Sequence, residues 1–183
     1  MSITSIAVFC GSQTGADPLF MQHAKELGES IGKNGITLIY GGGKKGLMGA
    51  VANAAMDNGG KVTGIIPELL IGWESQHQGI TDLQIVQDMH SRKKIMYDLC
   101  DAAIILPGGN GTLDEMFEML TWNTLKIHNK KLIILNTAGF YNHLIKHLEH
   151  MQECNFLYEN WRERILVVNS PDSIISFLGE GKN

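Results

Sequence analysis

The segment Ile36–Asn58, ITLIYGGGKKGLMGAVANAAMDN, joins a predicted strand, a glycine turn and a predicted helix. Ile36–Tyr40 is a short and continuous apolar run, typical of a strand that is covered on both faces of its sheet. Gly41–Gly49 contains five glycines. The helical stretch from Leu47 then stops at Gly59-Gly60, a common position for a helix end. This order of elements predicts a unit of a parallel α/β sheet.

The same alternation extends along the chain in both directions, with helical periodicity between further apolar runs. In the first helical stretch Asp17 fits an N-cap, Pro18 fits the first helical position, and Lys33-Asn34-Gly35 is a typical stop. We therefore predict one α/β domain over residues 1–178, a doubly wound parallel sheet flanked by helices, and a flexible tail at 179–183. The expected strands are Ile3–Cys10, Ile36–Tyr40, Val62–Ile66, Ala102–Leu106, Lys131–Asn136 and Ile165–Asn169, and residues 68–79 are expected to be irregular.

Composition limits the class of protein. Of the 183 residues, 44% are hydrophobic and 19% charged, so the chain can bury a sizeable core. The net charge is −4, whereas a nucleic-acid-binding protein usually shows a basic balance, so nucleic acid is not an expected partner. No segment approaches the roughly 18 apolar residues of a membrane span, and the N-terminus lacks the basic segment of a signal peptide. With three widely spaced cysteines and no Cys-x-x-Cys, these features predict a cytoplasmic protein without a membrane or metal site.

Glycines cluster at three of the predicted strand-to-helix turns, at residues 10–15, 41–49 and 107–112. Ligands of open parallel sheets bind at the carboxyl ends of the strands, and glycine turns let backbone N–H groups approach an anion. Each cluster alone is also explained by a tight turn. Three clusters on one sheet edge predict a ligand that carries a phosphate, with Ser12, Gly42 and Gly43 as candidates for its rim.

Two other nucleotide-binding patterns fit poorly. Gly41, Gly43 and Gly46 match G-x-G-x-x-G, but the acidic residue expected about 20 positions later is missing, since Glu68 lies beyond Pro67. This disfavours a dinucleotide-dependent oxidoreductase. The chain contains no G-x-x-x-x-G-K-[ST], which excludes a Walker-type site.

Two charged residues stand out near the glycine clusters. Arg92 falls between Met89 and Met96 on one face of a predicted helix, where a guanidinium needs an anionic partner unless it reaches back to water. Thr112 and Glu115 have the spacing of a capping box, which by itself would explain both residues. A carboxylate beside a glycine turn is also a common place for a catalytic acid or base. Spacing alone leaves both interpretations open.

Taken together, these motifs resemble those of the LOG family, the cytokinin riboside 5′-monophosphate phosphoribohydrolases, whose members have often been labelled lysine decarboxylases. The resemblance rests on Gly41–Gly49, Met89–Met96 and Pro107–Glu115, and it runs from Phe9 to Asn142. Asn110 fills a slot where many members carry an aromatic or aliphatic residue. Nothing in the sequence indicates a pyridoxal phosphate site, so the decarboxylase label is set aside.

The resemblance implies a homodimeric Rossmann-like hydrolase of cytokinin biosynthesis that needs no cofactor. Its substrate would be a nucleoside 5′-monophosphate, AMP-like ones included, and its products the free base and ribose 5-phosphate. The alternative is a non-catalytic carrier of nucleotide or molybdenum cofactor, because such carriers share the Pro-Gly-Gly-x-Gly-Thr turn. The presence of both Arg92 and Glu115, which match the catalytic pair of the family, favours the enzyme. The residues implied to contact substrate are Glu74, Arg92, Lys93, Gly109, Asn110, Gly111, Thr112, Leu113, Asp114, Glu115 and Thr121.

The helix expected after Thr112 is apolar on two faces, so it must be covered on two sides. The sheet covers one face, and a second copy of the chain is expected to cover the other. The two faces are predicted as Leu113, Met116, Phe117 and Leu120, and as Met119, Trp122 and Leu125.

Two further patterns are expected to be structural rather than functional. His143, His147 and His150 share a helix face that should point to solvent, and they lack a known metal-binding pattern. Cys10 at a strand end is interpreted as a small buried residue rather than a nucleophile.

Overall fold

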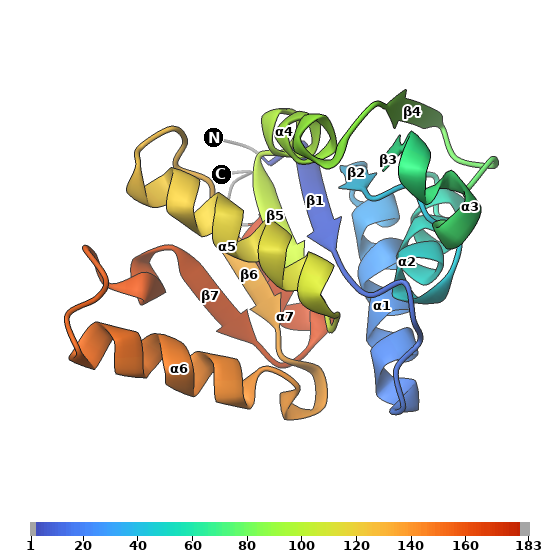
Figure 1. Ribbon diagram of the computed structural model, residues 1–183. Coiled ribbons are helices and arrows are strands. Elements are labelled where there is room, and N and C mark those ends of the chain that lie inside the picture. The colour runs from blue at the N-terminus through green and yellow to red at the C-terminus, as the bar shows by residue number, and fades with distance from the viewer. Residues whose placement is uncertain (1–2, 180–183) are drawn as a thin grey trace.

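The seven strands of the computed structural model form one parallel sheet (Figure 1). The structure describes residues 3–179, apart from the side chains of residues 73, 74, 175 and 177–179. Each of the six strands predicted from an apolar run is present. The strands are β1 (Ser5–Phe9), β2 (Thr37–Tyr40), β3 (Val62–Pro67), β4 (Asp82–Val86), β5 (Ala102–Ile105), β6 (Leu132–Leu135) and β7 (Ile165–Val168), and their order in the sheet is β4-β3-β2-β1-β5-β6-β7.

The strand order reverses at β1, which pairs with β2 on one side and with β5 on the other. This reversal confirms the predicted doubly wound topology. The turns that leave β1 and β5 are tied together, because the Gly11 N–H donates to the Pro107 carbonyl over 3.0 Å. The first and third glycine clusters therefore meet at the switch point of the sheet.

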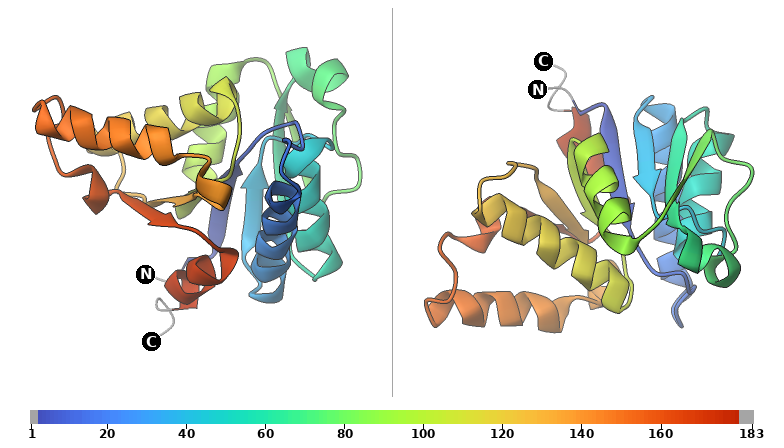
Figure 2. Two further views of the ribbon diagram at one scale, coloured as in Figure 1. Left: turned by 90° about the horizontal axis from the view of Figure 1, so that it is seen from below. Right: turned by 45° about the horizontal axis from the view of Figure 1, so that its top comes forward.

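Helices cover both faces of the sheet (Figure 2). Along β1, Ile6 and Val8 pack into one core and Ala7 and Phe9 into the other, as alternation of side chains across a strand requires. The first core is completed by α1 (Pro18–Lys33), α2 (Gly46–Asp57) and α7 (Pro171–Gly179), and the second by α4 (Met89–Leu99), α5 (Asn110–Thr124) and α6 (Asn142–Glu153).

The first helix begins and ends where its sequence predicts. Asp17 is the N-cap and its Oδ1 accepts from the Leu19 N–H over 2.9 Å, while Pro18 is the first helical residue. The helix ends at Lys33, before Gly35 in the left-handed region with φ of 67°. Local signals are therefore sufficient for this helix.

The strand β4 was not predicted. Its residues alternate between polar and apolar, so no continuous apolar run marks it, and at the edge of the sheet Ile85 remains 52% exposed. An edge strand with one open side does not need the apolar sequence of a buried strand.

The segment expected to be irregular is partly helical. Residues 68–79 contain a 3-10 turn, η1 (Glu68–Leu70), and a short helix, α3 (Ile71–Glu74). Two similar 3-10 turns, η2 (Thr137–Gly139) and η3 (Trp161–Glu163), precede α6 and β7. The tail predicted at 179–183 starts at the last residue of α7, and its other residues lie outside the described part of the chain.

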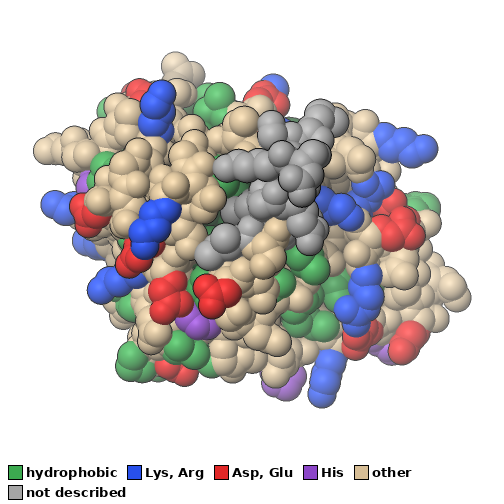
Figure 3. Space-filling view, turned by 180° about the vertical axis from the view of Figure 1, so that it is seen from behind, with side chains coloured by type: hydrophobic (Ala, Val, Ile, Leu, Met, Phe, Trp, Pro, Cys, Tyr) green, Lys and Arg blue, Asp and Glu red, His purple; other side chains and the backbone are tan. Residues whose placement is uncertain are grey.

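Charged side chains of both signs are interspersed on the face seen in Figure 3, in keeping with the modest net charge. Among the described residues, no helix is long and apolar enough to cross a membrane.

Candidate active site

A cavity of about 310 Å³ lies at the switch point of the sheet. It is bounded by the end of β1, the turn after β2, the start of α4 and the start of α5. This is where ligands bind in doubly wound sheets. Its lining residues are Val8, Phe9, Cys10, Gly11, Ser12, Gly41, Met48, Leu70, Met89, Arg92, Gly109, Asn110, Gly111, Thr112 and Glu115.

The start of α5 differs from the predicted capping box. The helix begins at Asn110 with Gly109 as its N-cap, so Thr112 already lies inside the first turn. The Thr112 hydroxyl instead packs against Gly108, where an added Cβ would lie 2.1 Å from the Thr112 Oγ1. The capping interpretation of Thr112 and Glu115 is therefore wrong.

Glu115 lies one turn further along α5, where it lines the cavity and is only 8% exposed. Burial of a carboxylate is unfavourable unless it has partners or a task. Its position in the cavity wall, past the first turn of α5, supports the chemical interpretation of this residue.

The first turn of α5 presents backbone donors to the cavity. The N–H groups at the start of a helix have no partners within the helix, and the helix dipole makes this end favourable for an anion. Asn110, Gly111 and Thr112 occupy this turn, and all three line the cavity. This end of α5 is well suited to a phosphate group.

Arg92 reaches the cavity from α4, where Asp88 caps the helix by accepting from the Ser91 N–H over 2.8 Å. The Arg92 side chain is 5% exposed, so the alternative that its guanidinium reaches back to water is wrong. Its Nη2 donates to the Gly41 carbonyl over 3.3 Å. A buried guanidinium next to a helix N-terminus makes this part of the cavity strongly favourable for an anion.

Lys93 points toward α5 rather than into the cavity. Its Nζ lies 3.0 Å from Asp114 Oδ2 and 3.0 Å from Glu118 Oε2, and the Tyr97 hydroxyl donates to the same Glu118 oxygen over 2.9 Å. Burial disfavours the ammonium charge, but the two carboxylates outweigh it and raise the pKa of Lys93. We call Lys93, Tyr97, Asp114 and Glu118 the α4–α5 clamp, since it joins the helices that carry Arg92 and Glu115.

The structure brings together about half of the residues implied by the family pattern. Ser12 of the phosphate rim also lines the cavity. Gly42 and Gly43 instead pair through their backbone with His77 and Gln76. Thr121 lies on the outer side of α5, in a different groove, and the Glu74 side chain lies outside the described residues. Of the implied substrate contacts, those in the cavity are Arg92, Gly109, Asn110, Gly111, Thr112 and Glu115.

Several lining residues were not singled out from the sequence. Gly11 belongs to the glycine turn after β1 and could have been found from that motif. Met48 and Met89 belong to the motifs Gly41–Gly49 and Met89–Met96 but were not expected to line the site, and no local pattern marks Leu70. Cys10 is buried, as expected, and it also lines the cavity. His143, His147 and His150 are exposed on α6, as expected.

Comparison with known proteins identifies the family. Residues 48–178 match a family model described as "Possible lysine decarboxylase". The chain is 42% identical over 173 residues to the cytokinin riboside 5′-monophosphate phosphoribohydrolase of Rhodococcoides fascians, covering 94% of this chain and 87% of the relative. An Arabidopsis thaliana protein of the same name is 39% identical over 175 residues, covering 96% and 81%.

Solved structures show the same fold at lower sequence identity. The molybdenum cofactor carrier protein of Chlamydomonas reinhardtii is 17% identical with a TM-score of 0.72, and 97% of each chain is covered. The molybdenum cofactor binding protein of Rippkaea orientalis is 20% identical with a TM-score of 0.71, covering 100% of this chain and 99% of that one. These likenesses confirm the Rossmann-like fold. The family match and the two relatives show that the chain belongs to the LOG family of cytokinin riboside 5′-monophosphate phosphoribohydrolases.

Proposed function

We propose that this chain hydrolyses the N-glycosidic bond of a nucleoside 5′-monophosphate and releases the free base and ribose 5-phosphate. One observation carries the proposal: Arg92 from α4 and Glu115 from α5 line the same cavity, beside the N-terminus of α5. The names of the relatives in the LOG family support the same reaction.

The 5′-phosphate is assigned to the first turn of α5, where the backbone N–H groups of Asn110, Gly111 and Thr112 are available. The Arg92 guanidinium adds a positive charge on the α4 side and fixes the geometry of the phosphate or ribose. With the phosphate held there, the sugar lies within the cavity that Glu115 lines.

Glu115 supplies the chemistry in this proposal. As the bond between C1′ and the base nitrogen breaks, positive charge develops on the sugar, and a buried carboxylate stabilises this oxocarbenium-like state. A water oxygen then bonds to C1′ and the departing base takes up a proton. Glu115 also has the chemistry to orient that water.

A non-catalytic carrier is less well supported. The molybdenum cofactor proteins share the fold with this chain, but at 17% and 20% identity they say nothing about its ligand. The relatives at about twice that identity are named as phosphoribohydrolases.

The test is to incubate the purified chain with AMP and with isopentenyladenosine monophosphate, and to measure free base and ribose 5-phosphate. We expect release of both products in equal amounts from at least one nucleotide. Tight binding of intact nucleotide without release from either compound would contradict the proposal and favour a carrier. The ratio of kcat/KM for the two nucleotides measures the preference for a cytokinin base.

We also propose that two copies of the chain associate through the outer side of α5. The side chains of Phe117 and Leu120 are only half-buried there, and Leu125 is 64% exposed. A groove of about 300 Å³ runs from α5 to α6 and to the segment before β7, with Phe156 79% exposed on it. A second copy of the same apolar helix is the occupant that this face fits, because a twofold interface pairs a patch with itself.

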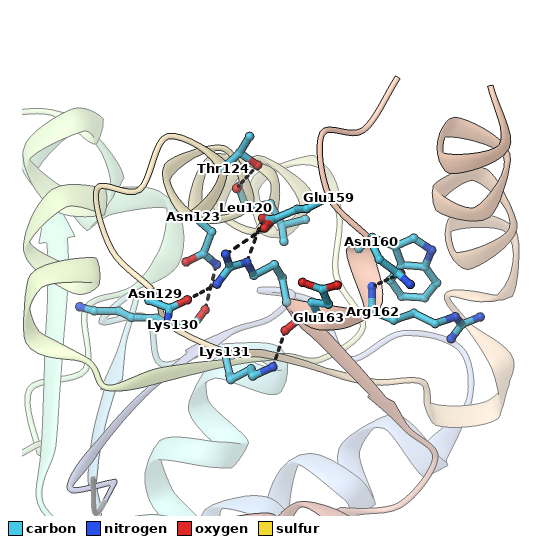
Figure 4. Close-up of polar contacts among 12 residues, drawn as sticks. Leu120, Asn123, Thr124, Asn129, Lys130, Lys131, Glu159, Asn160, Arg162 and Glu163 are labelled. Carbon is cyan, nitrogen blue, oxygen red and sulfur yellow. Dashed lines mark hydrogen bonds and ion pairs between the residues drawn. The ribbon is translucent and has the colours of Figure 1, made fainter. Parts of the chain in front are cut away.

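The polar border of this face is firmly held. Arg164 makes two bonds to Glu159, from Nε to Oε1 over 2.8 Å and from Nη2 to Oε2 over 2.9 Å, and it also contacts Asn129 (Figure 4). This pairing lowers the pKa of Glu159. An apolar groove with an ordered polar rim is the usual anatomy of an interface.

Finally, we propose that the chain acts in the cytoplasm. The support is its composition, with three widely spaced cysteines and no Cys-x-x-Cys. Fractionation of the producing cells tests this location.

A further inference from the structure

The segment 68–79, which we call the strap, connects β3 to the edge strand β4 and forms part of the cavity wall. Leu70 of the strap lines the cavity, and α3 within the strap contains Glu74 (Figure 1). The position of this wall relative to the glycine turns therefore sets the shape of the site on one side.

Backbone pairing joins the strap to the second glycine cluster. The Lys44 N–H donates to the Ser75 carbonyl over 2.9 Å, and the His77 N–H donates to the Gly42 carbonyl over 2.9 Å. Gln76 and Gly43 form an antiparallel bridge between these two bonds. Ser75 adopts φ of 51°, which is unfavourable for a residue with a side chain and persists only where surrounding contacts enforce it.

His77 adds a side-chain connection from the strap to α2. Its ring is 5% exposed, and its Nε2 lies 2.8 Å from Asn53 Oδ1. The Gly79 N–H donates to its Nδ1 over 3.3 Å. An amide oxygen accepts and a backbone N–H donates, so the two contacts together require a neutral ring that carries its proton on Nε2. Burial, and then the charge of Lys44, lower the pKa of His77 and favour this neutral form.

We propose that His77 is a positioning residue for substrate binding, which holds the strap against α2 and the second glycine turn and so fixes the Leu70 wall of the cavity. The proposal rests on the proposed function of the site. His77 and its partner Asn53 are not among the residues that line the cavity. His77 joins the strap to α2 through its ring and to the second glycine turn through its backbone N–H.

This role predicts an effect on substrate affinity rather than on bond cleavage. Arg92 and Glu115 stand on α4 and α5, whereas the His77 ring is bonded to Asn53 of α2 and to the Gly79 N–H. A side-chain change at Asn53 or His77 leaves the backbone bond from the His77 N–H to the Gly42 carbonyl formed most of the time. Gly41, to which Arg92 donates, should therefore keep its place while the wall at Leu70 loosens. We therefore expect KM to rise while kcat stays nearly constant.

The experiment compares Asn53→Ala, His77→Ala and His77→Gln with the wild-type chain in steady-state turnover of AMP. Asn53 is exposed on α2, so its removal breaks the bond to His77 without opening the core. Gln restores a donor near the position of Nε2 and should recover part of the loss. We expect KM to rise about fivefold to tenfold in Asn53→Ala and His77→Ala, less in His77→Gln, with kcat within about twofold, as for the loss of one buried hydrogen bond.

A matched control is His128→Gln. His128 is also bonded to an asparagine side chain, with 2.8 Å between its Nδ1 and Asn123 Oδ1, but it precedes β6, in the half of the sheet on the other side of β1. This variant should keep the wild-type KM. An unchanged KM in both Asn53→Ala and His77→Ala, or a fall in kcat at constant KM, would overturn the proposal.

Hydrogen exchange gives a second readout that does not depend on turnover. The amides of Lys44 and His77 should exchange faster in Asn53→Ala and His77→Ala than in the wild type, and those of the α4–α5 clamp should not. If the wild-type chain releases no base from AMP or from isopentenyladenosine monophosphate, the proposed function fails, and AMP affinity and amide exchange still test the strap. Unchanged exchange at both amides would overturn the proposal even in that case.

Discussion

Gly41 shows how a single missing side chain shapes the site. An added Cβ at this position would lie 2.0 Å from Arg92 Nη2 and 3.2 Å from the Met48 sulfur. Glycine is needed at this position because the Arg92 guanidinium, which bonds to the Gly41 carbonyl, occupies the space that a Cβ would take.

We predict that Gly41→Ala folds but displaces the Arg92 side chain. Its kcat/KM for AMP should fall about tenfold or more, as expected when a fork-shaped cation loses its position. Both changes remove the same interaction. The double variant Gly41→Ala/Arg92→Ala should therefore have about the same kcat/KM for AMP as Arg92→Ala alone. Additive losses in the double variant, measured by steady-state kinetics, would contradict this geometry.

Two histidines, His77, which is buried, and His128, which is partly buried, predict how the free energy of unfolding depends on pH. Burial lowers the pKa of both His77 and His128 below the ordinary value of 6.5, with further contributions from Lys44 in the first case and from Lys130 in the second. The unfolded chain therefore binds protons at a higher pH than the folded chain does. The free energy of unfolding should fall as the pH drops through about 6.5 and below.

Urea titrations at a series of pH values between about 7.5 and 5 check this expectation. His77→Gln, which cannot be protonated in this range, should flatten the dependence, and a further His128→Gln change should flatten it more. A wild-type free energy of unfolding that is constant across this range would contradict the prediction, because it would show that the two rings titrate alike in the folded and the unfolded chain.

At the scale of elements, the α4–α5 clamp gives Lys93 a structural task. The family pattern implies that this residue contacts substrate, whereas the structure shows its Nζ between Asp114 and Glu118. The side chain of Lys93 is 9% exposed, but that of Asp114 is 56% exposed, so solvent weakens part of the attraction.

We predict that Lys93→Met lowers the free energy of unfolding by about 1–2 kcal/mol, because Glu118 loses its cation in a half-buried place. Chemical denaturation measures this loss, and Lys93→Arg should recover part of it. An unchanged stability together with a large rise in KM would instead show that Lys93 serves the substrate.

The elements were predictable where the signal is local. Asp17 and Pro18 mark the start of α1, and apolar runs mark six strands, because covered strands and helix caps need particular residues. The edge strand β4 was missed, since one open side lets polar residues alternate along it. The capping-box interpretation placed the start of α5 three residues too late, because Gly109 caps the helix with its backbone alone.

The faces of α5 were also assigned incorrectly in part. Met116 and Met119 are both fully buried in the core, so they share the sheet side, whereas the prediction placed them on opposite sides. Phe117, Leu120 and Leu125 remain on the outer side. The helix does have two apolar sides, as predicted. Which residues belong to each side follows only from how the helix packs on the sheet.

At the scale of the whole molecule, we predict a dimer joined through the outer side of α5. Sedimentation velocity at micromolar concentration should show about twice the mass of 20.2 kDa. Leu120→Arg places a charge on this face and should give a monomer. Ile85→Arg, a matched change at the exposed edge strand β4, should leave the dimer intact. A monomeric wild type would rule out this interface.

The position of Thr121 adds a reason to examine the assembly. The family pattern implies that Thr121 contacts substrate, but it lies in the outer groove of α5 and not in the cavity of its own chain. A substrate contact by Thr121 would therefore have to be made to a nucleotide in the other copy. The sequence could not show this, because it does not place the two sides of α5 relative to the cavity.

The topology explains why the site as a whole could be located from sequence. The glycine turns follow strands that meet at the switch point, and parallel strands bring such turns to one edge. The division of roles within the site needed the structure. It showed that Glu115 lines the cavity, and that Lys93 belongs to the α4–α5 clamp.

The most direct test of the account is the rate of base release from AMP by Glu115→Gln. Gln keeps the size of the side chain and removes its charge, and Glu153→Gln, on α6 and outside the cavity, is the matched control. We predict that Glu115→Gln still binds AMP but releases adenine and ribose 5-phosphate at least about 100-fold more slowly, as for loss of a catalytic carboxylate, whereas Glu153→Gln stays within about threefold of the wild type. Release by Glu115→Gln at the wild-type rate would contradict the central claim that this carboxylate carries the reaction.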